Sequence, residues 1–227
     1  MNSIDIKNLK FSYIADEIIL DSIDFEVAEG EFAVIIGGNG SGKSTLIKNI
    51  LGELKPDKGE IKILGKKMNQ NSDYKDLGYV PQISVVEKIA FPITVIELVV
   101  LNLYKDFGFF KYPKKEHIRK ADEILKYMDL YSYRSVPINE LSGGLKQRSM
   151  IARAMVHDPK ILILDEPTVG VDKESKKQFL EMISKLNKEK KLTILLITHE
   201  LEEVMRLGQA QSLYEIKDKK LYRRELS

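Results

Sequence analysis

The sequence has no cysteine and only three histidines among its 227 residues. Disulfide bonds and thiolate metal sites are therefore excluded, and no obvious zinc site remains. The chain also lacks an excess of charge of one sign, because 36 basic residues nearly balance 34 acidic ones. Nucleic-acid binding usually requires a clearly basic domain or stripe, so this near balance argues against a nucleic-acid partner.

Long hydrophobic runs and the residue pattern of a signal peptide are not found in the sequence either. The longest apolar stretch, residues 89–104, is interrupted by Pro92 and Glu97 and is too short to span a bilayer comfortably. The first five residues do not follow the basic-then-apolar pattern of a signal peptide. We therefore expect a soluble chain that reaches a membrane only through a partner.

The sequence does contain alternating strand and helix patterns, in a chain long enough for one large domain. Alternating apolar residues up to position 27 predict half-buried strands, and the apolar run at 32–36 predicts a buried one. Helices are predicted at 43–51, 143–156, 173–188 and 200–207, strands at 60–64, 161–165 and 192–198, and a hairpin at 211–221. This order predicts an α/β fold with a mostly parallel central sheet and an antiparallel β region near the N-terminus.

Residues 85–139 differ from their surroundings in helical patterning, aromatic content and a basic patch. We therefore predict a single domain over residues 1–227, whose core (1–84 and 140–227) is interrupted by an inserted α-helical subdomain at 85–139. The aromatic and aliphatic residues up to Tyr112 are predicted to be mostly core. The basic stretch at 111–120 is predicted to be a solvated face, with attraction to an anionic membrane surface as the alternative.

A glycine-rich stretch follows the apolar run at 32–36 and precedes a predicted helix. Its residues fit the P-loop pattern and continue into the helix: Gly37, Gly38, Asn39, Gly40, Ser41, Gly42, Lys43, Ser44 and Thr45. Glycines allow successive backbone N–H groups to point at phosphate oxygens, and the helix N-terminus adds a favourable dipole. Lys43 supplies a positive charge to the β- and γ-phosphates, and the Ser44 hydroxyl can ligate Mg²⁺.

A second apolar run, at 161–165, ends in two consecutive carboxylates, Asp165 and Glu166. The carboxyl end of a parallel strand opens onto the ligand crevice, so Asp165 is predicted to reach the Mg²⁺ region. Glu166 is predicted to take a proton from an attacking water. An acid at a strand end is often only a helix cap, so this prediction depends on the P-loop that accompanies it.

Six motifs resemble those of the ABC ATPases and occur along the chain in the order that this family has. They are an aromatic motif at 11–13, a Q-loop at 80–82, a signature motif at 141–148, a Walker B motif with its continuation at 161–168, a D-loop at 169–172 and a switch-histidine motif at 197–200. Two departures from the family pattern are Leu145, where glutamine is commonest, and Gly38, where proline is commonest. The resemblance implies a P-loop NTPase that binds and hydrolyses ATP with Mg²⁺.

The resemblance also implies roles for single residues. Tyr13 would stack on adenine, with a core aromatic as the alternative, and His199 would contact the γ-phosphate and hold the attacking water. Gln82 would contribute to catalysis by joining Mg²⁺ and water to the helical subdomain. A head-to-tail homodimer would enclose two ATP molecules, each closed over by the other subunit's signature motif, Ser142, Gly143 and Gly144. Asp172 could simply cap the following helix; the resemblance adds a contact across the dimer interface, and the two roles are compatible.

The segments at 91–95, 156–159 and 169–172 resemble those of zinc, manganese or iron importers. The family therefore implies an ATPase at the cytoplasmic face of the cell membrane, with a transmembrane permease subunit and an extracytoplasmic substrate-binding protein as partners. One alternative is an ABC transporter with another cargo. A non-transport ABC ATPase acting on ribosomes or DNA is disfavoured, because such proteins usually carry two cassettes or a long coiled-coil insertion.

Overall fold

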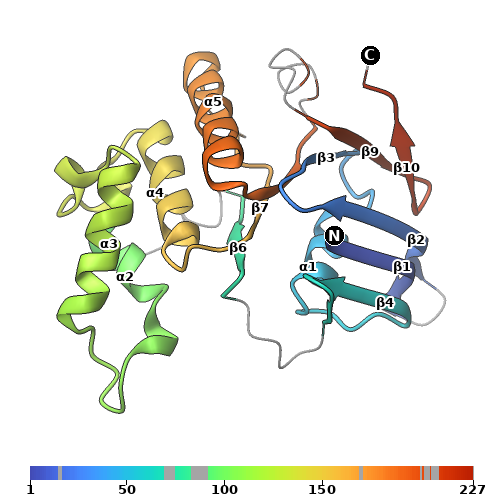
Figure 1. Cartoon of the computed structure of the whole chain (residues 1–227). Coiled ribbons are helices and arrows are strands. Elements are labelled where there is room, and N and C mark those ends of the chain that lie inside the picture. The colour runs from blue at the N-terminus through green and yellow to red at the C-terminus, as the bar shows by residue number, and fades with distance from the viewer. Residues whose placement is uncertain are drawn as a thin grey trace.

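Two separate β-sheets contain the strands of this chain, as the computed structural model shows (Figure 1). The structure describes residues 1–14, 17–68, 75–82, 92–168, 171–199, 201, 205 and 210–226. The smaller sheet has the strand order β2-β1-β4-β5 and is antiparallel throughout. Its strands are β1 (Asn2–Ser12), β2 (Ile18–Ala28), β4 (Lys58–Ile63) and β5 (Lys66–Lys67). The antiparallel region predicted near the N-terminus is therefore confirmed.

The larger sheet has the order β10-β9-β3-β8-β7-β6 and is parallel except for the closing β9–β10 hairpin. Its strands are β3 (Phe32–Ile36), β6 (Leu77–Val80), β7 (Ile161–Asp165), β8 (Thr193–Ile197), β9 (Ser212–Lys217) and β10 (Lys220–Arg224). The mostly parallel central sheet is confirmed, and β3 and β7 have the predicted bounds. The sequence pattern does not predict β6, which has only four residues.

The helices of the described residues cover both faces of the central sheet. They are α1 (Lys43–Ile50), α2 (Val95–Leu101), α3 (Lys115–Tyr127), α4 (Gly143–Met155) and α5 (Lys173–Lys190), with short 3₁₀ turns η2 (Tyr104–Asp106), η3 (Tyr131–Tyr133) and η4 (Ile138–Glu140). The helix predicted at 200–207 lies almost wholly outside the described residues. Among those described, no helix has both the length and the apolar run needed to cross a membrane.

The central sheet separates two hydrophobic cores. In β3, Phe32 and Val34 pack with α2 to α5 on one face, whereas Ala33 and Ile35 pack with α1 and the antiparallel sheet on the other. Strands β7 and β8 divide their residues in the same alternating way, because successive side chains of a strand point to opposite faces. Burial on both faces explains why these strands are continuous apolar runs in the sequence.

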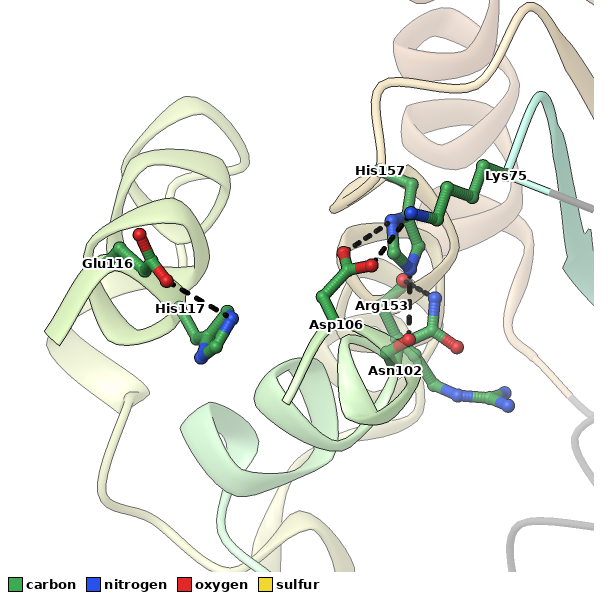
Figure 2. A network of polar contacts seen from close by, with 7 residues as sticks. All are labelled: Lys75, Asn102, Asp106, Glu116, His117, Arg153 and His157. Atoms are coloured by element: carbon green, nitrogen blue, oxygen red, sulfur yellow. Dashed lines mark hydrogen bonds and ion pairs between the residues drawn. The ribbon is translucent and has the colours of Figure 1, made fainter. Parts of the chain in front are cut away.

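The described part of the predicted helical subdomain, from residue 92, contributes α2, α3 and three 3₁₀ turns to the first of these cores. Its boundaries at 85 and 139 remain a prediction. Polar contacts also join it to the rest of the chain (Figure 2). Lys75, which precedes the edge strand β6, donates through Nζ to Asp106 Oδ1 at 2.7 Å, and Asn102 Nδ2 donates to the Arg153 carbonyl of α4 at 2.9 Å. The hydrogen bond from Lys75 holds the pKa of Asp106 below its ordinary value.

The prediction that the aromatic cluster is mostly core is wrong at its C-terminal end. Phe107 is buried, but Phe109, Phe110 and Tyr112 are exposed. The reason is local, because the chain turns outward there and Lys111 adopts a left-handed backbone conformation with φ of 53°.

Gly59 offers a test of how tightly β4 packs on β1. Its φ is +90°, and an added Cβ would lie 2.4 Å from the Asn8 carbonyl oxygen. Gly59→Ala should therefore lower the free energy of unfolding by more than about 2 kcal/mol, from left-handed strain and steric overlap together. Urea denaturation measures the change. Gly108→Ala, whose Cβ would meet nothing closer than 3.8 Å, is the matched control, and an equal loss in both variants would contradict the packing argument.

Candidate active site

The glycine-rich stretch forms a tight loop between β3 and α1. A Cβ on Gly37 would lie 2.7 Å from Ser41 Oγ and 2.8 Å from the Ile216 carbonyl oxygen, so only glycine allows the loop to close onto itself and onto β9. Gly42 caps α1 with a φ of 105°, a left-handed conformation that favours glycine. The loop therefore places the first turn of α1 at the carboxyl end of the central sheet.

Lys43 is buried inside this loop. Its Nζ donates to the carbonyl oxygens of Gly37 at 2.7 Å and Gly38 at 3.0 Å, and it lies 3.7 Å from Glu166 Oε1. A positive charge is thus held between the loop and the carboxylates that follow β7. An anion that entered the loop would meet this charge without a large rearrangement of the backbone.

The ends of β7 and β8 bring an acid and a histidine together. Because these strands are parallel neighbours, the residues that follow them meet at one edge of the sheet. Glu166 Oε2 lies 2.6 Å from His199 Nδ1, and the Glu166 backbone N–H donates to the Ile197 carbonyl. Glu166 has a φ of 47°, a left-handed backbone conformation that is uncommon for a residue with a side chain.

Asp165 lies deeper than Glu166, at the last position of β7. Its pKa is raised above the ordinary value because burial disfavours the charged form and because the Glu166 carboxylate is close. Tyr79 donates a hydrogen bond to Asp165 Oδ2 at 3.4 Å, and burial raises the pKa of this phenol. Sequence reasoning missed Tyr79, since its strand β6 was not predicted; the short apolar alternation before Pro81 is the signal that could have identified it.

These groups line one open cavity of about 490 Å³. The lining residues come from six separate parts of the chain: Tyr13, Ile19, residues 39–45, Gln82, Asp165 with Glu166, and His199. The cavity therefore brings together residues 39–45 of the predicted phosphate-binding loop, the predicted metal ligands Ser44, Gln82 and Asp165, and the predicted catalytic groups. Gly37 and Gly38 of the same loop do not line it. Among the described residues that line the cavity, Ile19 is the one that the sequence did not indicate.

Tyr13 lies at the rim of this cavity, and 54% of its surface is exposed. Its hydroxyl is 3.3 Å from Thr45 Oγ1, and its ring meets the ring of Phe11 edge-on at 4.9 Å between centroids. Such exposure does not fit the alternative of a core aromatic. The ring is available to a planar ligand, while its edge and hydroxyl are fixed by neighbours.

The described residues of the predicted signature motif and D-loop are not part of this cavity. Ser142 caps α4 by accepting from the Leu145 N–H, and Asp172 caps α5 by accepting from the Ser175 N–H. The two caps are close together, because a Cβ on Gly144 would lie 3.5 Å from Ser175 Oγ. Gly143, the first residue of α4, lies at the same place. Val169 and Gly170 lie outside the described residues. One chain therefore presents two separate groups of candidate residues.

A mostly parallel sheet whose carboxyl edge carries a glycine-rich loop, a buried lysine and two acids is the architecture of a P-loop NTPase. A family model described as ABC transporter matches residues 20–169. The zinc uptake system ATP-binding protein ZurA of Listeria monocytogenes is 44% identical over 201 residues, which cover 88% of this chain and 78% of that protein. The manganese transport system ATP-binding protein MntB of Bacillus subtilis is 36% identical over 206 residues, covering 89% and 79%.

The chain thus belongs to the ABC transporter family, as an ATP-binding ATPase subunit. Among solved structures, a dimeric ATP-binding cassette in a post-hydrolysis state, bound to ADP and Pi, superposes with a TM-score of 0.79 at 30% identity. The superposition covers 99% of both chains. The family, the fold class and the ATPase activity class predicted from the sequence are therefore confirmed. The roles of individual residues remain predictions.

Tyr13 gives a direct test of adenine binding in the cavity. Stacking of a base on an aromatic side chain contributes about 1–3 kcal/mol, so Tyr13→Ala should raise the dissociation constant for ATP about tenfold or more. Isothermal titration calorimetry measures the change. Tyr13→Phe keeps the ring and loses only the contact with Thr45, so it should bind nearly as the unaltered chain does. Equal weakening by the two variants would assign the effect to the hydroxyl and contradict stacking.

Proposed function

We propose that this chain hydrolyses ATP to drive the import of a transition-metal ion, zinc, manganese or iron, through a transmembrane permease. The observation that carries ATP hydrolysis is the single cavity in which the phosphate-binding loop, Lys43, Glu166 and His199 meet. Support for the cargo comes from relatives named for zinc uptake and manganese transport, at 44% and 36% identity. Another cargo for the same machinery is the alternative.

In this proposal Glu166 accepts a proton from the attacking water. His199, 2.6 Å away, fixes the orientation of the carboxylate and contacts the γ-phosphate. Lys43 and the backbone N–H groups of the loop stabilise the negative charge that develops on the transferred phosphate. The left-handed backbone at Glu166 turns this side chain back over the loop, toward Lys43.

The residues at the cavity also fit Mg²⁺. Ser44, Gln82 and Asp165 offer a hydroxyl, an amide oxygen and a carboxylate, which are the oxygen ligands that Mg²⁺ prefers. The raised pKa of Asp165 reflects a buried negative charge that a cation would relieve. In the part of the chain that the structure describes, no cluster of three or more His, Asp or Glu residues could hold a metal ion, so substrate phosphates would complete the coordination. When bound, Mg²⁺ would neutralise charge on the β- and γ-phosphates.

The second group of residues supports a homodimer. Ser142, Gly143 and Gly144 expose backbone N–H groups at the N-terminus of α4, a favourable surface for an anion, yet they lie outside their own chain's cavity. We propose that each signature motif and Asp172 complete the site of the partner subunit. A dimeric cassette at 30% identity is consistent with this arrangement. In the cell the dimer would lie at the cytoplasmic face of the membrane, with the permease and an extracytoplasmic substrate-binding protein.

The Glu166→Gln variant tests catalysis and dimerisation together. Glutamine keeps the size of the side chain and removes its basicity, so ATP hydrolysis should fall at least about 100-fold while ATP still binds. Uncleaved ATP should then hold two subunits together, which size-exclusion chromatography with light scattering detects.

Glu181→Gln, an exposed position on α5, is the matched control and should hydrolyse ATP like the unaltered chain. Hydrolysis by Glu166→Gln at the unaltered rate would refute the general-base assignment. An inactive Glu166→Gln that stays monomeric at saturating ATP would instead refute the composite site.

Deletion of this subunit tests the cargo. Growth of the native host should slow on chelator-treated medium and recover when one of zinc, manganese or iron is added in excess. Uptake of the radioactive ion by cells, with a Lys43→Ala subunit as the hydrolysis-deficient control, measures transport directly. Normal metal uptake in the deletion strain, together with lost uptake of an organic nutrient, would assign the transporter to another cargo.

A further inference from the structure

The turn between η2 and α3 exposes three aromatic side chains to solvent. In this aromatic tip, which we define as residues 108–115, Phe109 is 94% exposed, Phe110 is 81% exposed and Tyr112 is 77% exposed. The rings of Phe109 and Phe110 meet edge to face, at 5.5 Å between centroids. Exposed aromatic clusters of this kind mark sites of contact with a partner or a membrane.

The aromatic tip is an ordered turn rather than a frayed one. The Lys111 N–H donates to the Gly108 carbonyl at 3.0 Å, which closes the turn. At its base Phe107 and His117 are buried, with rings 4.9 Å apart, and the Lys114 N–H donates to His117 Nδ1 at 2.9 Å. The buried pair fixes both ends of the turn, so its aromatic side chains are held away from the core.

The charge around the aromatic tip is strongly positive, although the whole chain is nearly neutral. Residues 108–120 contain five basic side chains and one acidic one. The acidic residue, Glu116, lies 3.8 Å from His117. In the part of the chain that the structure describes, Lys111, Lys114 and Lys115 form no ion pair with a carboxylate. Lys111 Nζ lies over the Tyr104 ring, 5.0 Å from its centroid, so no carboxylate of the described residues neutralises this charge next to the exposed rings.

We propose that the aromatic tip binds the surface of an anionic lipid bilayer. Rings that enter the interfacial region and lysines that face acidic headgroups are the two components of interfacial membrane attachment. The tip lies at the end of the part of the chain formed by α2 and α3, away from the antiparallel sheet (Figure 1). A bilayer could therefore contact the tip without obstructing the cavity. The proposal depends on the transport role only in that this role brings the chain close to a membrane.

The absence of tryptophan from the sequence allows a local test. Phe109→Trp introduces a single fluorescent reporter at the tip. With vesicles that contain phosphatidylglycerol, its emission should shift to the blue and be quenched by brominated acyl chains. With vesicles of phosphatidylcholine alone, the shift should be much smaller. Tyr222→Trp on β10, at the other end of the chain, is the matched reporter and should not respond.

Charge reversal at the tip tests the electrostatic part. In the Phe109→Trp background, Lys111→Glu with Lys115→Glu should reduce partitioning into anionic vesicles at least about tenfold. The matched control is Lys66→Glu with Lys188→Glu, two exposed lysines on β5 and α5, which should leave partitioning unchanged. Each variant should retain ATP hydrolysis, so loss of lipid binding is distinguishable from loss of the proposed function.

Two results would overturn the proposal. One is a reporter at position 109 that does not respond to anionic vesicles at any concentration, in a chain that still hydrolyses ATP. The other is a blue shift that occurs only in nanodiscs carrying the permease and is insensitive to brominated lipid. That second result would make the aromatic tip a protein contact instead.

Discussion

The parallel pairing of β7 with β8 is the constraint on which the candidate site depends. The register that sets Asp165 opposite Ile197 makes both strands end at the same level, so Glu166 and His199 emerge side by side. The Glu166 N–H then bonds the Ile197 carbonyl, and the Thr198 N–H bonds the carbonyl of Ile35 in β3. Through β3 the same ladder positions the glycine-rich loop. A shift of this register would separate the acid from the lysine that it faces.

Much of this arrangement could be predicted from the sequence, because the strands that carry it are buried on both faces. Such strands are uninterrupted apolar runs, and both β3 and β7 were predicted with their observed bounds. The strand β6 could not be predicted, since its four residues include Gly78 and its pairing with β7 joins positions far apart in the chain. Tyr79 was missed for the same reason: its contact with Asp165 follows from tertiary pairing and not from a local pattern.

The signature and D-loop segments show a different limit. Ser142 and Asp172 are helix caps in the structure, which local sequence rules predict by themselves. Whether they also contact a nucleotide depends on a second subunit, and no pattern within one chain contains that geometry. Likewise, the exposure of Phe109 and Phe110 runs against the usual rule that large apolar residues are buried, so only the folded turn reveals it.

At Glu166 the residue that would give the most stable fold differs from the residue that the proposed catalysis requires. A left-handed conformation is easier for glycine or asparagine than for glutamate, so stability alone would favour a different residue at this position. A laboratory selection for heat resistance, carried out without a demand for activity, would tend to discard this glutamate early. Under the proposed role of Glu166 as the general base, a selection that couples growth to ATP turnover would retain this residue. Residue 166 would then indicate which of the two selections a population of variants had passed through.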